Sequence, residues 1–163
     1  SEEAAGRIIA ETLDRIERAT GTRPKGWLGA GRQETWGTLD RLAAEGCTYV
    51  VDWDSDDLPI AMDIAGKTMV SMPYGAGGSD LQAFNLHHHT AEDFETMIKS
   101  AFDVLYRESE HSGRVASISL HPYLIGMPHN IGALDRALAH IRSHDGVWCA
   151  TGSEIVDHFH TTR

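Results

Sequence analysis

The stretch Thr48-Tyr49-Val50-Val51-Asp52-Trp53 decides the fold, because it is a short strand that ends in an acidic and an aromatic side chain. β-Branched and aromatic residues favour strands. A helix over 35–45, ended by Gly46, precedes this strand, and a second strand over 69–72 follows it and ends at Pro73. Strands and helices in alternation predict a parallel sheet or barrel with helices on its faces.

The alternation continues in both directions. Toward the N-terminus, residues 2–20 repeat apolar side chains at spacings of three and four, which predicts an amphipathic helix capped by Ser1 and ended by Gly21. An extended segment over 23–28 follows this helix. Because the predicted strands are fewer than usually close a barrel, we expect an open sheet edge that another segment covers. The remaining predicted elements are a helix from a Thr90 cap with Asp93 to about Glu110, strands over 115–120 and 147–150, and helices over 131–143 and from Ser153.

Composition narrows the possible partners. The chain has 163 residues, enough for one domain, and 14 Lys and Arg against 24 Asp and Glu give a net charge of −10. This balance argues against binding nucleic acid or an anionic membrane. No apolar run approaches the length of a membrane span, about 20 residues. Cys47 and Cys149 stand in apolar stretches, which predicts buried free thiols and a reducing, cytoplasmic setting.

Candidate site residues follow the predicted strands. In parallel α/β folds, ligands bind at the carboxyl ends of the strands. We expect the side chains at these positions to converge on one rim and to suit acid–base hydrolysis in a partly apolar cleft. These residues are Arg23, Trp27, Asp52, Trp53, Tyr74, His121 and Tyr123.

His121 has two interpretations. Histidine titrates near neutrality, so His121 can donate a proton to a leaving nitrogen. A strand-end histidine bonded to the backbone fits its position equally well. Asp52 is interpreted as orienting or tuning a neighbouring cation, and Trp53 as an apolar wall, whereas Asp54 is expected to belong to a solvated acidic loop.

The other histidines are predicted not to bind metal. Neighbouring residues of an extended chain face opposite ways, so His87-His88-His89 is expected to form a solvent-facing or substrate-edge loop. His140 and His144 are spaced four apart on a helix, a spacing that can hold Zn²⁺, but the sequence offers no evident third ligand. Gly75–Ser79 lacks the pattern of a phosphate-binding loop.

Several motifs together resemble the polysaccharide-deacetylase family (NodB homology, carbohydrate esterase family 4). Residues 20–29 with Glu34-Thr35, and 49–53 with Asp56-Asp57 and Pro59, carry the first part of the likeness. Residues 119–124, with Gly126 and Pro128-His129, are similar to the family's final catalytic motif, and 145–152 to its closing strand and turn. The closer likeness is to the cytoplasmic branch with allantoinase-like and peptidoglycan-deacetylase-like members.

The resemblance implies a fold and an activity. Residues 1–163 would be the C-terminal part of a single α/β domain, a distorted (β/α) barrel lacking its N-terminal strands. The activity would be hydrolysis of C–N bonds in amides, either N-acetyl groups of saccharides or cyclic ureides. His121 would be the general acid, and Arg23 and Asp52 would orient catalytic groups. The substrate cleft would be lined by Trp27, Trp53, Tyr74 and Tyr123.

The resemblance also implies partners. The family's metal ligands and general base come from an Asp-Asp and a His-x3-His motif, both upstream of the matched region. A divalent metal, zinc or a similar ion, would therefore be held by a complementary N-terminal segment, and activity would require that segment. Some allantoinase-like relatives work without a metal, so the ion stays open. We also expect a homo-oligomer.

Some positions depart from the family pattern. Asn130 stands where Arg is usual, Ala30 replaces a Pro, and Gly77-Gly78-Ser79-Asp80 replaces the usual Glu-x-Asn-Asp. These departures support an alternative, a non-catalytic binding or scaffold subunit that keeps the barrel. The presence of His121 and Asp52-Trp53 weighs against that alternative.

Overall fold

The structure, a computed structural model, describes residues 2–75 and 77–162. The helix cap predicted at Ser1 lies outside these residues. The chain divides into two compact units, Ser1–Met72 with Ala150–Arg163, and Pro73–Cys149. We call them unit 1 and unit 2 and describe each by itself.

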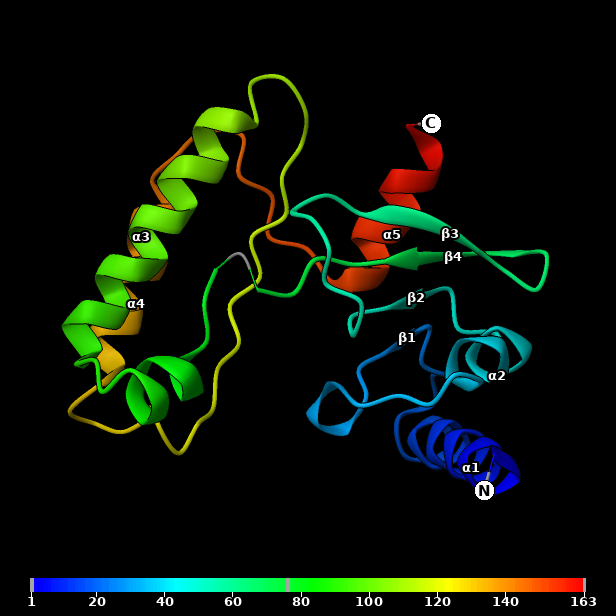
Figure 1. The fold of residues 1–163 in the computed structure, drawn as a ribbon. Helices are drawn as coiled ribbons and strands as arrows, with labels where there is room; N and C mark the ends of the chain where they lie inside the picture. The colour runs from blue at the N-terminus through cyan, green and yellow to red at the C-terminus, as the bar shows by residue number, and fades with distance from the viewer. Residues whose placement is uncertain (1, 76, 163) are drawn as a thin grey trace. The chain divides into compact units, whose positions relative to one another are not determined.

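Unit 1 contains a four-stranded sheet of order β1-β2-β4-β3 (Figure 1). β1 (Gly26–Trp27), β2 (Tyr49–Val50) and β4 (Lys67–Ser71) are parallel, as predicted, whereas β3 (Ile60–Ile64) is antiparallel to β4. The sequence analysis missed β3. Its hairpin to β4 turns through Ala65 and Gly66, which both have positive φ (52° and 77°), as a two-residue type I′ turn requires. Ala-Gly is a weaker turn signal than Asn-Gly, which explains the omission.

Helices cover both faces of this sheet. α1 (Glu2–Thr20) and α2 (Thr38–Ala44) pack on the face that carries Val50 and Met69. α5 (Gly152–Thr161) packs on the opposite face, against Tyr49 and Val70. Successive residues of a strand point to opposite faces, so β2 and β4 each contribute to both cores. A short 3₁₀ turn, Ala30–Arg32, follows β1.

Unit 2 is built around two long helices, α3 (Ala91–Glu108) and α4 (Ile131–Arg142), and a π-helical turn over Gln82–Leu86. Thr90 and Asp93 form the capping box that the sequence predicts for α3. The core of the unit consists of Ala83, Phe94, Ile98, Ile125, Leu134 and Ala137.

Two predicted strands are wrong. Residues 115–120 are extended but form only an isolated bridge, Ser79 to Ser119, and 147–150 are not assigned to a strand. High β-propensity produces extended backbone, but a strand also needs a neighbouring ladder, which the described residues do not supply at these positions. Cys47 is buried as predicted, whereas Cys149 is exposed, contrary to prediction. Among the described helices, none has the length and apolar character needed to cross a membrane.

Candidate functional site

His121 and Asp80 form a close polar contact within unit 2. The Asp80 carboxylate accepts one hydrogen bond from the His121 backbone N–H (2.6 Å) and lies 2.6 Å from the His121 ring Nδ1. Asp80 is completely buried, whereas the His121 side chain is 30% exposed. A buried carboxylate is costly unless donors compensate it, and here both donors come from His121. With Nδ1–H directed at Asp80, the ring Nε2 is left for a second partner.

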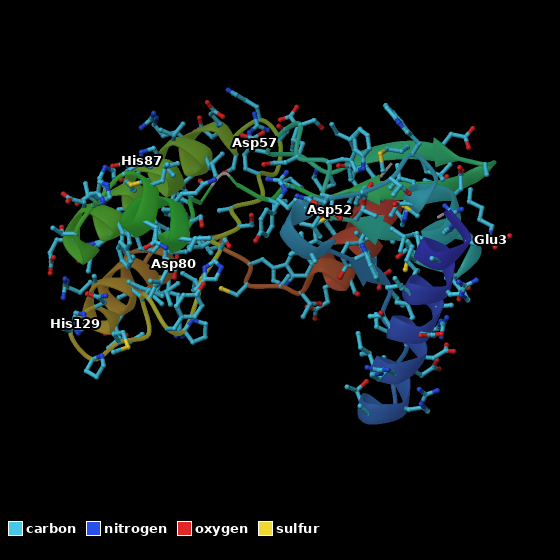
Figure 2. All side chains as sticks on the ribbon, turned by 60° about the horizontal axis from the view of Figure 1, so that its bottom comes forward. Glu3, Asp52, Asp57, Asp80, His87 and His129 are labelled. Atoms are coloured by element: carbon cyan, nitrogen blue, oxygen red, sulfur yellow. The ribbon has the colours of Figure 1, made fainter. Side chains whose placement is uncertain are left out.

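The backbone around this pair is held closely. Ser119 N–H donates to the Gly78 carbonyl, and Asp80 N–H donates to the Ser119 carbonyl, which joins the loop before α3 to the segment that carries His121. A Cβ on Gly77 would lie 2.5 Å from the Ser117 carbonyl oxygen, so only glycine permits this approach. Asp80, which Figure 2 labels, therefore reaches His121 through backbone segments that hydrogen bonds hold together.

Two predicted aromatic residues lie near His121 within unit 2. The rings of Tyr123 and His121 are 5.5 Å apart in an edge-to-face arrangement, and Tyr123 is 64% exposed. The Tyr74 hydroxyl is 2.9 Å from the Ser119 hydroxyl. The sequence analysis placed both tyrosines at the substrate cleft, which stays a prediction.

Asp52 lies at the carboxyl end of β2 in unit 1. Both of its carboxylate oxygens accept from the Gly29 backbone N–H, at 3.0 and 2.8 Å. Arg32 donates to the Asp52 backbone carbonyl (3.1 Å). The Asp52 carboxylate is thus oriented from β1, the neighbouring parallel strand.

Glu34 lies beside Asp52 and was not predicted as a site residue. Its Oε2 accepts from the indole N–H of Trp53 (2.7 Å), whereas its Oε1 is buried without a hydrogen-bond partner among the described residues. Burial is the main cause that raises the pKa of Glu34, and the neighbouring Asp52 carboxylate raises it further, against the opposing effect of the Trp53 N–H. The ionisation of Glu34 therefore depends on its burial and on the neighbouring Asp52 carboxylate.

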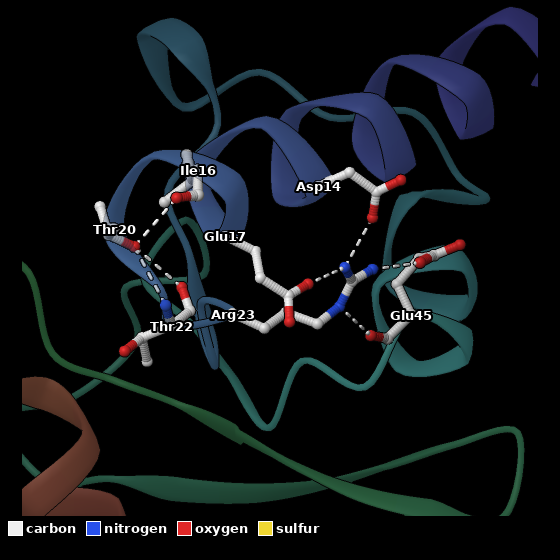
Figure 3. Close-up of polar contacts among 7 residues, drawn as sticks. All are labelled: Asp14, Ile16, Glu17, Thr20, Thr22, Arg23 and Glu45. Carbon is white, nitrogen blue, oxygen red and sulfur yellow. Dashed lines mark hydrogen bonds and ion pairs between the residues drawn. The ribbon is translucent and has the colours of Figure 1, made fainter.

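Arg23 lies away from Asp52. Its guanidinium pairs with Asp14 (2.7 Å), Glu17 (3.0 Å) and Glu45 (2.7 Å), which joins α1 to the end of α2 (Figure 3). These hydrogen bonds raise the pKa of Arg23, first through Asp14. Arg23 precedes β1 and Asp52 follows β2, so the two residues stand at opposite ends of a parallel pair. The orienting role implied for Arg23 stays a prediction, and its contacts in the structure stabilise helix packing.

The structure thus brings the predicted residues together in two groups. In unit 1, Asp52 and Trp53 are joined through Glu34, and Trp27 packs against the core next to α1 and α2. In unit 2, His121 contacts Tyr123 and the unpredicted Asp80. The motif Gly77–Asp80 was noted only as a departure from the family pattern, although its acidic residue was a signal that could have identified Asp80.

Two further groups of histidines were considered in the sequence analysis. His87, His88 and His89 are exposed, in agreement with the predicted solvent-facing loop. His140 and His144 do have a third potential ligand, Asp103 of α3, which the sequence analysis missed because it lies far away along the chain.

These features define the class of the protein. The sheet of unit 1, with helices on both faces, is a mixed α/β fold with a partial sheet, as predicted. The chain superposes on the crystal structure of PuuE allantoinase with a TM-score of 0.90 and 31% identity, covering 100% of this chain and 55% of that one. A Pseudomonas aeruginosa PAO1 structure described as a polysaccharide deacetylase gives a TM-score of 0.89 and 32% identity, covering 99% of this chain and 54% of that one.

Two further comparisons agree. A Mycobacterium smegmatis structure, also described as a polysaccharide deacetylase, shares the fold at 21% identity with a TM-score of 0.83, covering 99% of this chain and 58% of that one. A Schizosaccharomyces pombe protein named as a polysaccharide deacetylase is 36% identical over 108 residues, which are 63% of this chain and 33% of that protein. No protein-family model matches the chain.

The chain is thus similar in sequence and fold to polysaccharide deacetylases and to an allantoinase, which supports the NodB-like deacetylase superfamily. It spans about half the length of the solved structures that it matches.

Proposed function

We propose that this chain carries the general-acid part of an amide hydrolase, with His121 as the acid. The observation that supports this proposal is the completely buried Asp80 at 2.6 Å from the His121 ring Nδ1. A carboxylate in this position holds the imidazole in one orientation, with Nδ1–H bonded to Asp80, and leaves Nε2 to carry the proton that is donated.

The chemistry follows from the two ring nitrogens. Nδ1–H stays bonded to Asp80, so the proton that moves is the one on Nε2 of protonated His121. Nε2 gives this proton to the leaving nitrogen as the C–N bond breaks, and the amine departs neutral. Asp52 would orient catalytic groups through its fixed carboxylate, as the resemblance implies.

The described residues around His121 and Asp52 do not fit a metal site. The Asp80 oxygens are bonded to His121, and both Asp52 oxygens are bonded to Gly29 N–H. A divalent metal for the reaction, zinc or a similar ion, would be held by the complementary N-terminal segment that the resemblance implies.

The substrate we propose is an amide of the N-acetyl-saccharide or cyclic-ureide class. Exposed aromatic side chains, Trp53 and Tyr123, offer flat apolar surfaces of the kind that such rings stack against. A complementary N-terminal polypeptide segment, implied by the family resemblance, is part of the proposal as a partner. A homo-oligomer and a cytoplasmic location also belong to the proposal; the unpaired Cys47 and Cys149 support the latter.

The alternative, a binding or scaffold subunit, is less well supported. It rested partly on the replaced motif at Gly77–Asp80, but that motif still supplies the buried partner of His121. A scaffold has no need for a half-exposed imidazole held by a buried carboxylate.

Replacement of His121 tests the proposal. In the complete protein, assayed against N-acetyl sugars, allantoin and cyclic imides, His121→Ala should lower turnover by about 10²- to 10⁴-fold, the range of general acid–base catalysis. His111→Ala removes an exposed histidine of the same unit and should keep full turnover. Equal turnover in His121→Ala and the unchanged protein would show that His121 is not the acid.

A further inference from the structure

A cluster of three potential metal ligands lies in unit 2, apart from the His121–Asp80 pair. One ligand atom each of Asp103, His140 and His144 lies within 4.8 Å of the other two. His140 lies in the last turn of α4, and His144 follows two residues after the end of that helix, with the two ring centroids 4.8 Å apart. Asp103 comes from α3. The His140 Nε2 is 2.6 Å from an Asp103 carboxylate oxygen.

We propose that Asp103, His140 and His144 bind a divalent transition-metal ion that clamps α3 to α4. Two imidazoles and one carboxylate are a common ligand set of Zn²⁺, with water in the fourth position. This site is built only from residues of this chain and does not depend on the proposed hydrolase activity.

The orientation of His144 supports the proposal. Its Nδ1 is 2.9 Å from the His140 backbone carbonyl, an acceptor, so Nδ1 carries the proton and Nε2 keeps its lone pair. Metal-binding histidines commonly have one ring N–H bonded to a carbonyl or carboxylate in this way. Phe102 and Tyr106 of α3 pack edge-on against the His144 ring, with centroids 5.0 and 4.8 Å away, and hold it in place.

The separations are compatible with a bound ion. Ligand atoms around tetrahedral zinc are about 3.3 Å apart, given bonds of about 2.0–2.1 Å. The present distances, from 2.6 Å for the His140–Asp103 pair to at most 4.8 Å, lie on both sides of that value. The Asp103 side chain is 47% exposed, so it can shift without disturbing the core. A cleft of about 400 Å³, lined by Arg142, His144, Val147 and Cys149, leaves room next to His144 for a water ligand.

The clamp would reinforce an existing helix contact. Arg136 of α4 pairs with Glu95 of α3 at 2.6 Å, and the Tyr106 hydroxyl donates to the Asp145 carbonyl at 3.0 Å. From one contact to the next, the residue numbers rise both on the α3 side and on the α4 side. The two helices therefore run parallel (Figure 1). The proposed site lies between the other two contacts and would fix the carboxyl-terminal halves of the helices to each other.

Zinc competition against a chromophoric chelator tests the site. After metal removal, the unchanged protein and the control His111→Ala should take up equal amounts of zinc, whereas His144→Ala and Asp103→Asn should each lose one equivalent per chain. Zinc bound at other sites of the protein is the same in all four proteins, so it cancels when their zinc contents are compared. Zinc should raise the melting temperature of the unchanged protein and of His111→Ala by several degrees more than that of His144→Ala and Asp103→Asn.

Two outcomes would overturn the proposal. In the first, His144→Ala and Asp103→Asn bind as much zinc per chain as the unchanged protein. In the second, His111→Ala loses as much zinc as His144→Ala and Asp103→Asn do, as expected for unspecific binding to surface histidines. Asp103→Asn keeps the size of a half-exposed side chain, so the test remains valid if His144→Ala folds poorly.

Discussion

Asp80 and His121 are 41 residues apart in the sequence, yet they share two contacts. The backbone N–H of His121 fixes one Asp80 oxygen, and the imidazole Nδ1 faces the other. The ring therefore has little freedom to rotate, and its Nε2 keeps one direction. An orientation fixed before substrate arrives is what proton transfer at a defined atom requires.

Asp80→Asn should lower turnover of the complete protein by about 10²- to 10⁴-fold, because the amide can neither stabilise a protonated imidazole nor enforce the same tautomer. Steady-state kinetics measure this loss, and thermal melting checks that the variant is folded. If kcat is unchanged in a folded variant, Asp80 has only a structural role.

Glu34 provides a prediction about pH. Because burial raises its pKa, the folded protein favours the protonated carboxyl, and the resulting stability is present at low pH. This contribution is lost as the pH rises above the ordinary value of 4.5 and through the folded-state pKa. Glu34→Gln cannot ionise but can still accept from the Trp53 N–H, so it should lose less stability than the unchanged protein over this range.

Urea denaturation at a series of pH values measures the difference between the two proteins. The free energy of unfolding of Glu34→Gln, relative to the unchanged protein, should increase with pH. A difference that is constant with pH would contradict the raised pKa of Glu34.

At the scale of elements, the turn after His121 depends on one glycine. A Cβ on Gly126 would lie 2.3 Å from the Pro122 carbonyl oxygen, closer than any real contact, and backbone cannot swing away as a side chain can. Gly126→Ala should therefore shift the turn that carries His121 and Tyr123, lower turnover, and destabilise the protein by about 1–3 kcal/mol.

Gly132→Ala is the matched control. Its Cβ would meet only the end of the Arg136 side chain, at 3.4 Å, and alanine is the better helix former in α4. Denaturation should show this variant to be at least as stable as the unchanged protein. Equal effects of the two substitutions would show that the Gly126 contact does not matter.

At the scale of the whole molecule, the two units have separate cores. The core between α1, α2 and the sheet contains Leu13, which is 1% exposed, whereas the core of unit 2 is centred on Phe94 and Ile98. Leu13→Ala should cost about 2–5 kcal/mol, because it removes buried methyl groups and leaves a cavity. We expect this loss to be confined to unit 1.

Hydrogen exchange measures where the loss occurs. Amides of α1, β1 and β2 should exchange faster in Leu13→Ala, and those of α3 and α4 at an unchanged rate. Ile8→Ala, on the same helix but 61% exposed, should change neither. Faster exchange throughout the chain would indicate one cooperative unit.

The sequence by itself determined the features that depend on neighbouring residues. The apolar spacing over 2–20 predicted α1, the Thr90 and Asp93 pair predicted the start of α3, and the motifs around Asp52 and His121 indicated the superfamily. Helical periodicity, caps and short motifs act within a few residues, so the printed order of residues contains them.

Only the tertiary structure decided which distant groups meet. Asp80 joins His121 and Asp103 joins His140 across 41 and 37 residues, and no local pattern specifies either pairing. The same reason explains the errors at 115–120 and 147–150, because a strand exists only where another strand pairs with it. Backbone propensity is local, whereas ladders, buried ion pairs and ligand sets depend on where the rest of the chain packs.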